Sequence, residues 1–432
     1  MTLFFERPDH GERAVLVHLK LNNESEPEDV NEFKELVGAA GGDSVELILG
    51  SRQVPHPKYF VGTGKLEEIA SCVKSQAADL VIFNHNLSPS QERNLESELG
   101  CRVLDRTGLI LDIFAMRART HEGKLQVELA QLQHLSTRLV RGWTHLERQK
   151  GGIGLRGPGE TQLESDRRMV RERIKSIQNR LEKVRKQRAQ GRRSRDKSDV
   201  PTVSLVGYTN AGKSTLFNAL TQSEVFAADQ LFATLDPTMR RLDIPEQGIV
   251  VFADTVGFIS HLPHRLVDAF RATLEEASSA SLLLHVIDAA AEDRAVNVSR
   301  VNDVLREIGA DDLPTLLVYN KIDLIDNTTP RIERDDQGRP LAVWLSALTG
   351  AGLDLLLQAV CERLPRKMVC KSLQLKSSQG ALRAALYQHK AVIKESFSQT
   401  GDINLEIQLP EGDFCRLLKD SGLNLKDLMP AS

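Results

Sequence analysis

One segment of the 432-residue chain constrains its fold more than any other, the run GYTNAGKS at residues 207–214. It follows the apolar run TVSLV and precedes LFNAL, so the pattern GxxxxGK[ST] lies between a predicted strand and a predicted helix. In that setting backbone amides at the helix N-terminus form a cradle for phosphate, Lys213 reaches the β- and γ-phosphates, and the Ser214 hydroxyl binds Mg²⁺. The predicted phosphate-binding residues are Gly207, Tyr208, Thr209, Asn210, Ala211, Gly212, Lys213, Ser214 and Thr215.

A second motif selects the base. Asn320, Lys321 and Asp323 lie in NKID, directly after the apolar run PTLLVY. The Asp323 carboxylate can accept hydrogen bonds from guanine N1–H and the 2-amino group, a pair of donors that adenine lacks, while Asn320 and the Lys321 stem pack near the base. After a later predicted strand come Ser346, Ala347 and Leu348, where a backbone amide can meet guanine O6. Together with the phosphate loop, these motifs predict GTP or GDP as the nucleotide.

Two further segments have the pattern of nucleotide switches. Asp254 follows the run GIVVFA and is predicted to reach Mg²⁺ through water, and the Gly257 amide is placed to sense the γ-phosphate. Thr234 is predicted to add its hydroxyl to Mg²⁺ only when a γ-phosphate is present; the alternative is an ordinary loop threonine. We expect residues 232–238, the first switch segment, and 254–265, the second switch segment, to be ordered by GTP and Mg²⁺. Their predicted nucleotide-binding residues are Phe232, Ala233, Thr234, Leu235, Asp236, Asp254, Thr255, Val256 and Gly257.

The same residues supply the predicted chemistry. The catalytic set is Lys213, Thr234 and Gly257, and the metal set is Ser214, Thr234 and, through water, Asp254. Phe258 occupies the position where many GTPases place a glutamine that orients the attacking water. Because phenylalanine has no donor or acceptor, we expect slow hydrolysis in isolation. Asn210 has two open interpretations, a ligand for K⁺ beside the phosphates or a loop-stabilising residue.

Charge is distributed unevenly along the chain. Its 56 basic and 59 acidic residues give a net charge of −3, yet residues 138–197 carry 19 Lys or Arg against 7 Asp or Glu, a net of +12. Such a segment favours RNA as a partner, although solvated charge on amphipathic helices is the alternative. Candidate RNA contacts are Trp143, His145, Arg156, Arg185, Lys186, Arg192 and Arg193.

The order of predicted elements indicates a multi-domain α/β protein. Residues 1–120 alternate strands (14–21, 44–50, 79–83, 101–105) with helices (about 28–40, 65–76, 88–98). Leucines at three- and four-residue spacing then predict two antiparallel helices over 121–192 with a glycine-rich tip at 151–159. Residues 191–199 are predicted to be a linker, 200–366 a P-loop domain with a mostly parallel sheet, and 370–432 a small α+β domain.

Several lone features favour ordinary structural roles. The segment Gly62 to Lys65 is predicted to start a helix, and His285 is expected in the core rather than at a ligand. The five cysteines are widely spread, which predicts reduced packing residues. Neither a signal sequence nor an apolar run of about 18 residues is apparent, so we expect a cytoplasmic protein with at most peripheral membrane contact.

These motifs, with the run GGIGLRGPGETQLE at 151–164, resemble the HflX family of translation-associated GTPases over nearly the whole chain. The resemblance implies GTP hydrolysis with Mg²⁺, and binding to the large (50S) ribosomal subunit, the 70S ribosome and 23S rRNA. It implies a function in ribosome splitting or rescue, with subunit biogenesis as a further use, and a monomer. It also implies ATP-dependent work by the N-terminal domain, where the sequence contains no comparable motif.

Three alternative functions stay open on the residues alone. A P-loop ATPase or kinase would lack a role for Asp323. A non-enzymatic RNA-binding module would hold its nucleotide only as a structural element. A membrane-associated regulator would bind lipid through the basic helices.

Overall fold

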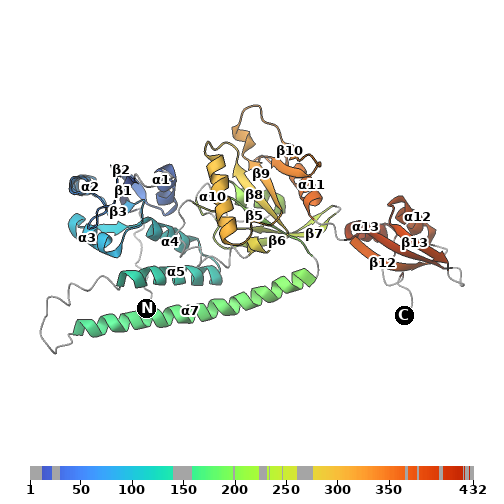
Figure 1. Ribbon diagram of the computed structural model, residues 1–432, viewed down its shortest axis with the longest axis horizontal. Helices are drawn as coiled ribbons and strands as arrows, with labels where there is room; N and C mark the ends of the chain where they lie inside the picture. The colour runs from blue at the N-terminus through green and yellow to red at the C-terminus, as the bar shows by residue number, and fades with distance from the viewer. Residues whose placement is uncertain are drawn as a thin grey trace.

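The computed structural model describes residues 12–21, 30–139, 158–197, 200–222, 231–232, 234–245, 247–259, 276–364, 368–376, 379–397, 402–421, 423 and 428. Three sheets and a pair of long helices account for the shape of the chain (Figure 1). The N-terminal and P-loop domains lie next to each other above the helix pair, and the C-terminal domain lies beyond the P-loop domain. The predicted fold class, α/β with a P-loop domain and smaller flanking domains, is confirmed.

The N-terminal domain is a parallel four-stranded sheet in the order β2-β1-β3-β4. Its strands are β1 (Arg13–Leu21), β2 (Asp43–Arg52), β3 (Leu80–Phe83) and β4 (Arg102–Leu104). The predicted helices are present as α1 (Val30–Ala39), α2 (Thr63–Gln76) and α3 (Pro89–Leu99), and Gly62 is the N-cap of α2, so the segment starts a helix as expected. A fourth helix, α4 (Arg106–Arg117), was not predicted; the side chain of Asp105 caps it by accepting from the Gly108 amide at 2.8 Å.

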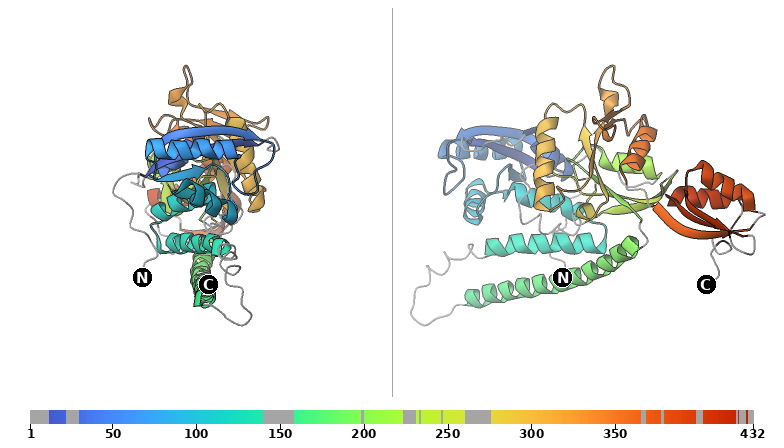
Figure 2. Two further views of the ribbon diagram at one scale, coloured as in Figure 1. Left: turned by 90° about the vertical axis from the view of Figure 1, so that its left-hand side faces the viewer. Right: turned by 45° about the vertical axis from the view of Figure 1, so that its right-hand side comes forward.

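The two long helices form an arm. α5 (His121–Leu139) and α7 (Pro158–Lys197) lie side by side (Figures 1 and 2), and Leu125, Leu129 and Leu132 pack against Ile177 and Leu181. This pairing confirms the predicted helical hairpin. The predicted linker at 191–199 is wrong over 191–197, because α7 continues to Lys197. Arg, Lys and Gln are good helix formers, so a polar exposed helix needs no apolar anchors to continue.

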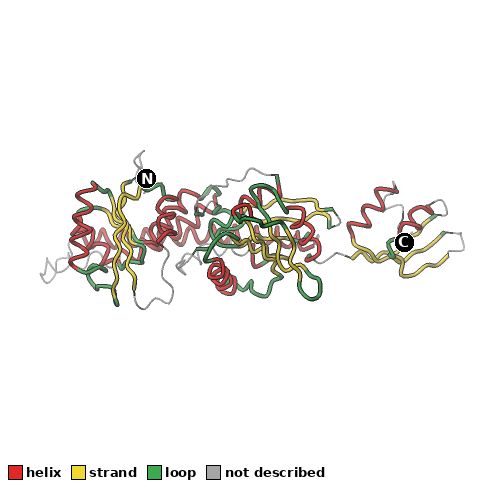
Figure 3. The backbone as a smooth tube through the Cα atoms, turned by 90° about the horizontal axis from the view of Figure 1, so that it is seen from above, coloured by secondary structure: helices red, strands yellow, loops and turns green. Residues whose placement is uncertain are grey.

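The P-loop domain has a seven-stranded sheet in the order β10-β11-β9-β8-β5-β7-β6. The pairs β10·β11 and β6·β7 at its two edges are antiparallel, and the pairs between them are parallel. Helices flank this sheet when the chain is viewed from above (Figure 3). The elements are β5 (Thr202–Val206), α8 (Lys213–Thr221), β6 (Thr238–Ile244), β7 (Gly248–Asp254), β8 (Leu282–Asp288), α10 (Arg294–Glu307), β9 (Thr315–Asn320), the short 3-10 helix η1 (Ile322–Leu324), β10 (Arg331–Arg334), β11 (Pro340–Trp344) and α11 (Leu353–Arg363).

The C-terminal domain is a three-stranded antiparallel sheet, β12-β14-β13, with two helices. It contains β12 (Met368–Leu375), α12 (Gly380–Gln388), β13 (Val392–Phe397), β14 (Ile403–Pro410) and α13 (Glu411–Ser421), which agrees with the predicted small α+β domain. Leu373, Leu386 and Leu405 belong to its own buried core. Among the described residues no helix is long and apolar enough to cross a membrane, and Cys72, Cys101 and Cys361 are free thiols.

A chain of polar contacts joins the N-terminal domain to the phosphate loop. The Tyr208 hydroxyl donates to Glu32, which forms a buried ion pair with Arg106. The Arg106 guanidinium also donates to Asn84 Oδ1 at 2.6 Å, and Asn84 Nδ2 lies 3.1 Å from His18 Nδ1. Glu32, Arg106, Asn84 and His18 are all less than 9% exposed. Buried charges need such partners, so this series of polar contacts holds the two domains in one relative position.

We predict that Arg106→Met destabilises the protein much more than Arg102→Met does. The first change leaves the Glu32 carboxylate buried without its cation, at a cost of about 3–5 kcal/mol. The Arg102 side chain is 52% exposed and lies 3.7 Å from Glu12 and 3.6 Å from Asp112, so its loss should cost about 1 kcal/mol or less. Urea unfolding of both variants measures the difference, and equal losses would contradict it.

His285 gives a pH-dependent prediction. It lies in the core of β8, as expected, where burial and then the charge of Lys213 lower its pKa to about 4. An unfolded histidine has a pKa of about 6.5. Between these values the unfolded chain binds a proton that the folded chain does not, so the free energy of unfolding falls as the pH falls from about 6.5 to about 4.

The measurement is urea unfolding at pH 7 and pH 5. His285→Leu should lose less stability between these pH values than the wild type does, because it removes one proton-binding group from the unfolded chain. His389→Leu, at an exposed position, is the matched control and should keep the wild-type loss. The same pH dependence in wild type and His285→Leu would disprove the assignment.

Candidate GTP-binding site

The phosphate loop connects the end of β5 to the start of α8, and two of its glycines are required by the space around them. A Cβ on Gly207 would lie 2.2 Å from the Val286 carbonyl oxygen, and one on Gly212 would lie 2.2 Å from Asn320 Nδ2. Lys213 is buried and donates to the carbonyl oxygens of Gly207 at 3.1 Å and Tyr208 at 2.6 Å. These contacts curl the loop around the lysine, as the motif predicts.

Burial lowers the pKa of Lys213 to about 8, while the Asp254 carboxylate raises it. A nearby anion stabilises the charged form of a buried ammonium group, because it replaces the interactions with water that the group has lost. The residue is therefore suited to bind phosphate oxygens. In the same loop Asn210 has a φ of +60°, a conformation that asparagine tolerates better than most residues, which supports its loop-stabilising interpretation.

The three predicted metal ligands meet at one point. Ser214 Oγ and Thr234 Oγ1 lie 2.7 Å apart, and both donate to Asp254 Oδ2, at 2.8 and 2.9 Å. Asp254 is fully buried, which raises its pKa, and its Oδ1 atom has no hydrogen-bond partner among the described residues. Two hydroxyls and a buried carboxylate with a spare oxygen form the donor set that Mg²⁺ prefers, so these residues fit the ion.

The base-recognition motifs also come together. Asn320 Nδ2 donates to the Ala211 carbonyl at 2.9 Å, and Asn320 Oδ1 accepts from the Ala347 amide at 2.9 Å. The asparagine thus links the phosphate loop to residues 346–348. Ser346 Oγ donates to Asp323, and Lys321 Nζ pairs with Asp288 at 2.8 Å. Leu348 is 79% exposed.

The second switch segment is attached to the phosphate loop. The Phe258 amide donates to the Gly207 carbonyl at 3.1 Å, and the Thr209 amide donates to the Phe258 carbonyl at 2.7 Å. The Phe258 side chain is buried in a core cluster with Val206 and Leu283. A Cβ on Gly257 would lie 2.9 Å from Lys213 Nζ, so only glycine fits there. The phenylalanine is therefore a packing residue that fixes the adjacent Gly257 beside the lysine.

The side chains around Thr234 and Asp254 face the N-terminal domain. Phe232, Leu235 and Val256 are buried in one cluster with residues of α1, α4 and α5, and the Phe232 ring packs edge-on against Phe114, with ring centroids 4.6 Å apart. Asp236 bonds to residues 119 and 120. Thr255 Oγ1 donates to the β5 backbone at 2.6 Å. Phe232, Leu235, Asp236 and Val256 thus contact the N-terminal domain, and Thr255 bonds to β5, so none of these five predicted nucleotide-binding side chains joins the metal ligands.

Several predicted features lie outside the described residues: Ala233, residues 260–265 of the second switch segment, the tip with Trp143, His145 and Arg156, and the side chains of Arg192 and Arg193. The sequence analysis also missed two contacts with the N-terminal domain, Glu32 with Tyr208 and Thr120 with Asp236. Glu32 had a detectable signal, because it lies on the same helical face as the buried residues Phe33 and Leu36. An acid on an apolar face predicts a buried partner. Thr120 gave no such signal.

The P-loop, the paired hydroxyls at Asp254 and the NKID motif on one parallel sheet define a P-loop GTPase. Family comparisons agree along the chain: "GTP-binding GTPase N-terminal" matches residues 27–115, "GTP-binding GTPase Middle Region" 117–195, "50S ribosome-binding GTPase" 202–321 and "HflX C-terminal domain" 332–426. GTPase HflX of Escherichia coli is 61% identical over 415 residues, covering 96% of this chain and 97% of that protein. The chain belongs to the HflX family of GTPases.

Two further similar proteins have lower sequence identity to the chain. GTPase HflX of Caldanaerobacter subterraneus is 46% identical over 390 residues, covering 90% of this chain and 89% of its own length. A solved GTP-binding protein from Sulfolobus solfataricus in complex with GDP is 26% identical, with a TM-score of 0.43 over 82% of this chain and 98% of that one. As a member of the HflX family, the chain is a GTP-binding GTPase, as the motifs predict.

Base choice should depend on Asp323. Replacing it with Asn puts a partial donor opposite two guanine donors, a loss of charged hydrogen bonds worth roughly 1.5–3 kcal/mol each. We expect Asp323→Asn to bind GTP at least about tenfold more weakly and to regain affinity for xanthosine triphosphate. Fluorescence titration with both nucleotides measures this. Unchanged GTP affinity in the variant would remove Asp323 from the site.

Proposed function

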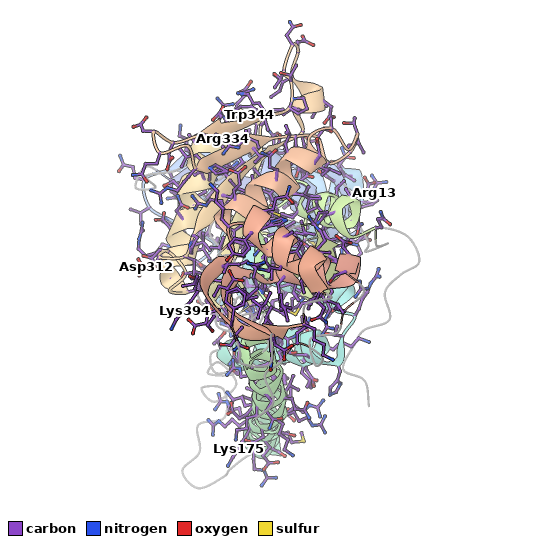
Figure 4. All side chains as sticks on the ribbon, turned by 90° about the vertical axis from the view of Figure 1, so that its right-hand side faces the viewer. Arg13, Lys175, Asp312, Arg334, Trp344 and Lys394 are labelled. Atoms are coloured by element: carbon purple, nitrogen blue, oxygen red, sulfur yellow. The ribbon has the colours of Figure 1, made fainter. Side chains whose placement is uncertain are left out.

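We propose that this GTPase cycles on and off the large ribosomal subunit and uses GTP hydrolysis to reset after ribosome splitting or rescue. The observation that carries the proposal is the arm. α7 carries exposed basic side chains, and Figure 4 shows Lys175 on the arm, far from the labelled Trp344 of the GTPase sheet. The family name "50S ribosome-binding GTPase", matched by residues 202–321, supports the same partner.

The charge on this arm is partly free for a partner. Arg173 pairs with Glu128 at 2.6 Å, and Arg188 pairs with Glu122 at 2.7 Å, so these two basic residues hold α5 and α7 together. Arg171, Lys175, Arg180 and Lys183 are exposed and have no ion-pair partner among the described residues. Four unpaired cations on one helix match a phosphate backbone such as that of 23S rRNA. The set extends the sequence-based candidates, of which Arg185 is half-buried and Lys186 lies 4.0 Å from Glu182.

The nucleotide cycle follows from the site. Ser214 and Thr234 would hold Mg²⁺ directly and Asp254 would hold it through water, and the ion when bound neutralises charge on the phosphates. Lys213 would donate to the β- and γ-phosphate oxygens, and the Gly257 amide would donate to the γ-phosphate. Loss of that phosphate removes the partner of the Gly257 amide and weakens the hold on Thr234.

Hydrolysis in isolation is expected to be slow. The Phe258 side chain lies in a core cluster and offers no group to orient the attacking water, so the chain relies on positioning supplied from elsewhere. Two sources fit, the ribosome and a K⁺ ion held beside Asn210. A turnover rate that is higher in K⁺ than in Na⁺ at equal ionic strength would favour the ion.

Co-sedimentation tests the proposal. With a non-hydrolysable GTP analogue the protein should pellet with 50S and 70S particles and dissociate in GDP, and 50S particles should raise GTP turnover. Binding only to 30S particles, or equal binding in both nucleotides, would refute it. If ribosomes did not change the GTP turnover rate, the alternative of an RNA-binding module that holds its nucleotide only as a structural element would be favoured.

The arm gives a quantitative prediction. Changing Arg171, Lys175, Arg180 and Lys183 to Gln should flatten the dependence of log K on log[salt] by about 3–4, since each phosphate contact contributes about 0.9. Filter binding of 50S particles across a salt series measures the slope. The matched control replaces Arg331 and Arg339, which are exposed on the GTPase domain and already paired with acids. An unchanged slope in the arm variant would exclude these four contacts.

A further inference from the structure

Asp236 of the first switch segment occupies the N-terminus of arm helix α5. Its Oδ2 accepts from the amides of Arg119 at 2.9 Å and Thr120 at 2.8 Å, and its Oδ1 accepts from Thr120 Oγ1 at 2.5 Å. Thr120 Oγ1 in turn accepts from the Gly123 amide at 3.0 Å. Arg119 and Thr120 immediately precede α5, and because the N-terminus of a helix carries partial positive charge, a carboxylate there is favourable.

Three consecutive residues are thereby attached to three different parts of the molecule. Thr234 bonds to Ser214 and Asp254 in the predicted metal site. Leu235 is buried in the N-terminal domain cluster, and Asp236 holds α5. Three residues span at most about 10 Å, so Thr234 and the start of α5 cannot move independently.

The other end of α5 is fixed as well. Arg138 in its last turn donates to Glu92 of α3 at 2.7 Å and pairs with Asp105 at 3.1 Å. Near its start Glu122 pairs with Arg188 of α7, which also lies 3.9 Å from Glu276 of the GTPase domain. The position of the arm and the position of the start of α5, where Asp236 is bound, are therefore connected.

We propose that Asp236 is a positioning residue for GTP hydrolysis: by binding Arg119 and Thr120 at the start of α5, it holds Thr234 at the metal site and couples the γ-phosphate to the arm. The inference rests on the proposed roles of Thr234 and the arm. Coupling of this kind is reciprocal, so a partner that fixes α5 raises the affinity for GTP by the factor by which GTP raises the affinity for that partner.

The Asp236 carboxylate lies very close to the backbone of Gly123 in α5. A Cβ at this position would lie 2.0 Å from Asp236 Oδ1 and 3.2 Å from Thr120 Oγ1. Glycine is a poorer helix former than alanine. The smallest residue is needed here because the carboxylate occupies the space that a side chain would fill.

Gly123→Ala is therefore the central test. The added methyl group should stabilise α5 as a helix and displace the Asp236 carboxylate. If the Asp236 contact only stabilised the structure, this variant would not lose affinity for the GTP analogue selectively. We expect the affinity for a non-hydrolysable GTP analogue to fall at least about fivefold while the affinity for GDP is unchanged. Calorimetry measures both affinities. Amide hydrogen exchange should show that the analogue no longer protects residues 121–124 more than GDP does.

Gly64→Ala is the matched control. Gly64 also lies in the first turn of a helix, α2, and a Cβ there would meet no atom within 4 Å. This variant should keep the wild-type ratio of analogue to GDP affinity.

A hydroxyl series gives a second, milder test if Gly123→Ala folds poorly. Thr120→Ser keeps the donor to Asp236 and should keep the affinity ratio, whereas Thr120→Val removes it and should lower the ratio. The proposal is overturned if Thr120→Val keeps the wild-type ratio, or if analogue and GDP affinities fall equally in either variant. None of these measurements uses ribosomes. If 50S particles did not stimulate the wild-type protein, the proposed function would be contradicted, but the test of the Asp236 contact would still stand.

Discussion

The burial of apolar side chains from both switch segments in the core of the N-terminal domain is the constraint on which the rest of the structure depends. Leu235 precedes the α5 contact, Phe232 packs on Phe114, and Val256 and Ile259 follow the predicted metal ligand Asp254. Each buried side chain of this size contributes about 1.5–3 kcal/mol. The nucleotide site and the N-terminal domain therefore share one core, and neither segment can change conformation without exposing part of it.

This shared core explains why the switch segments alternate between polar and apolar contacts. Thr234 and Asp254 bond to each other and to Ser214, whereas Leu235 and Val256 pack in the cluster formed with α1, α4 and α5. The polar chain from Tyr208 through Glu32 to Arg106 makes a second connection between the same two domains. The switch segments of this GTPase are therefore coupled to the packing of the neighbouring N-terminal domain.

The sequence predicted the parts of the site that depend on local pattern. The phosphate loop, Asp323 and the Ser214, Thr234 and Asp254 set lie at strand ends, where motif and topology together fix position. It did not predict α4, because residues 106–111 of that helix are all buried and leave no one-sided periodicity. It misjudged residues 191–197, where charge indicated a linker but helix-forming residues continue α7. The contacts of Tyr208 and Asp236 were missed because each joins residues more than 100 positions apart.

The unbroken length of α7 has a mechanical consequence. Its 40 residues extend over about 60 Å at 1.5 Å per residue. A tilt of about 5° at the end next to the GTPase domain displaces the opposite end by roughly 5 Å, since displacement grows with the length of a stiff rod. A small tilt of α7 beside the GTPase domain would thus become, at the far end of the arm, a movement about as large as one turn of helix.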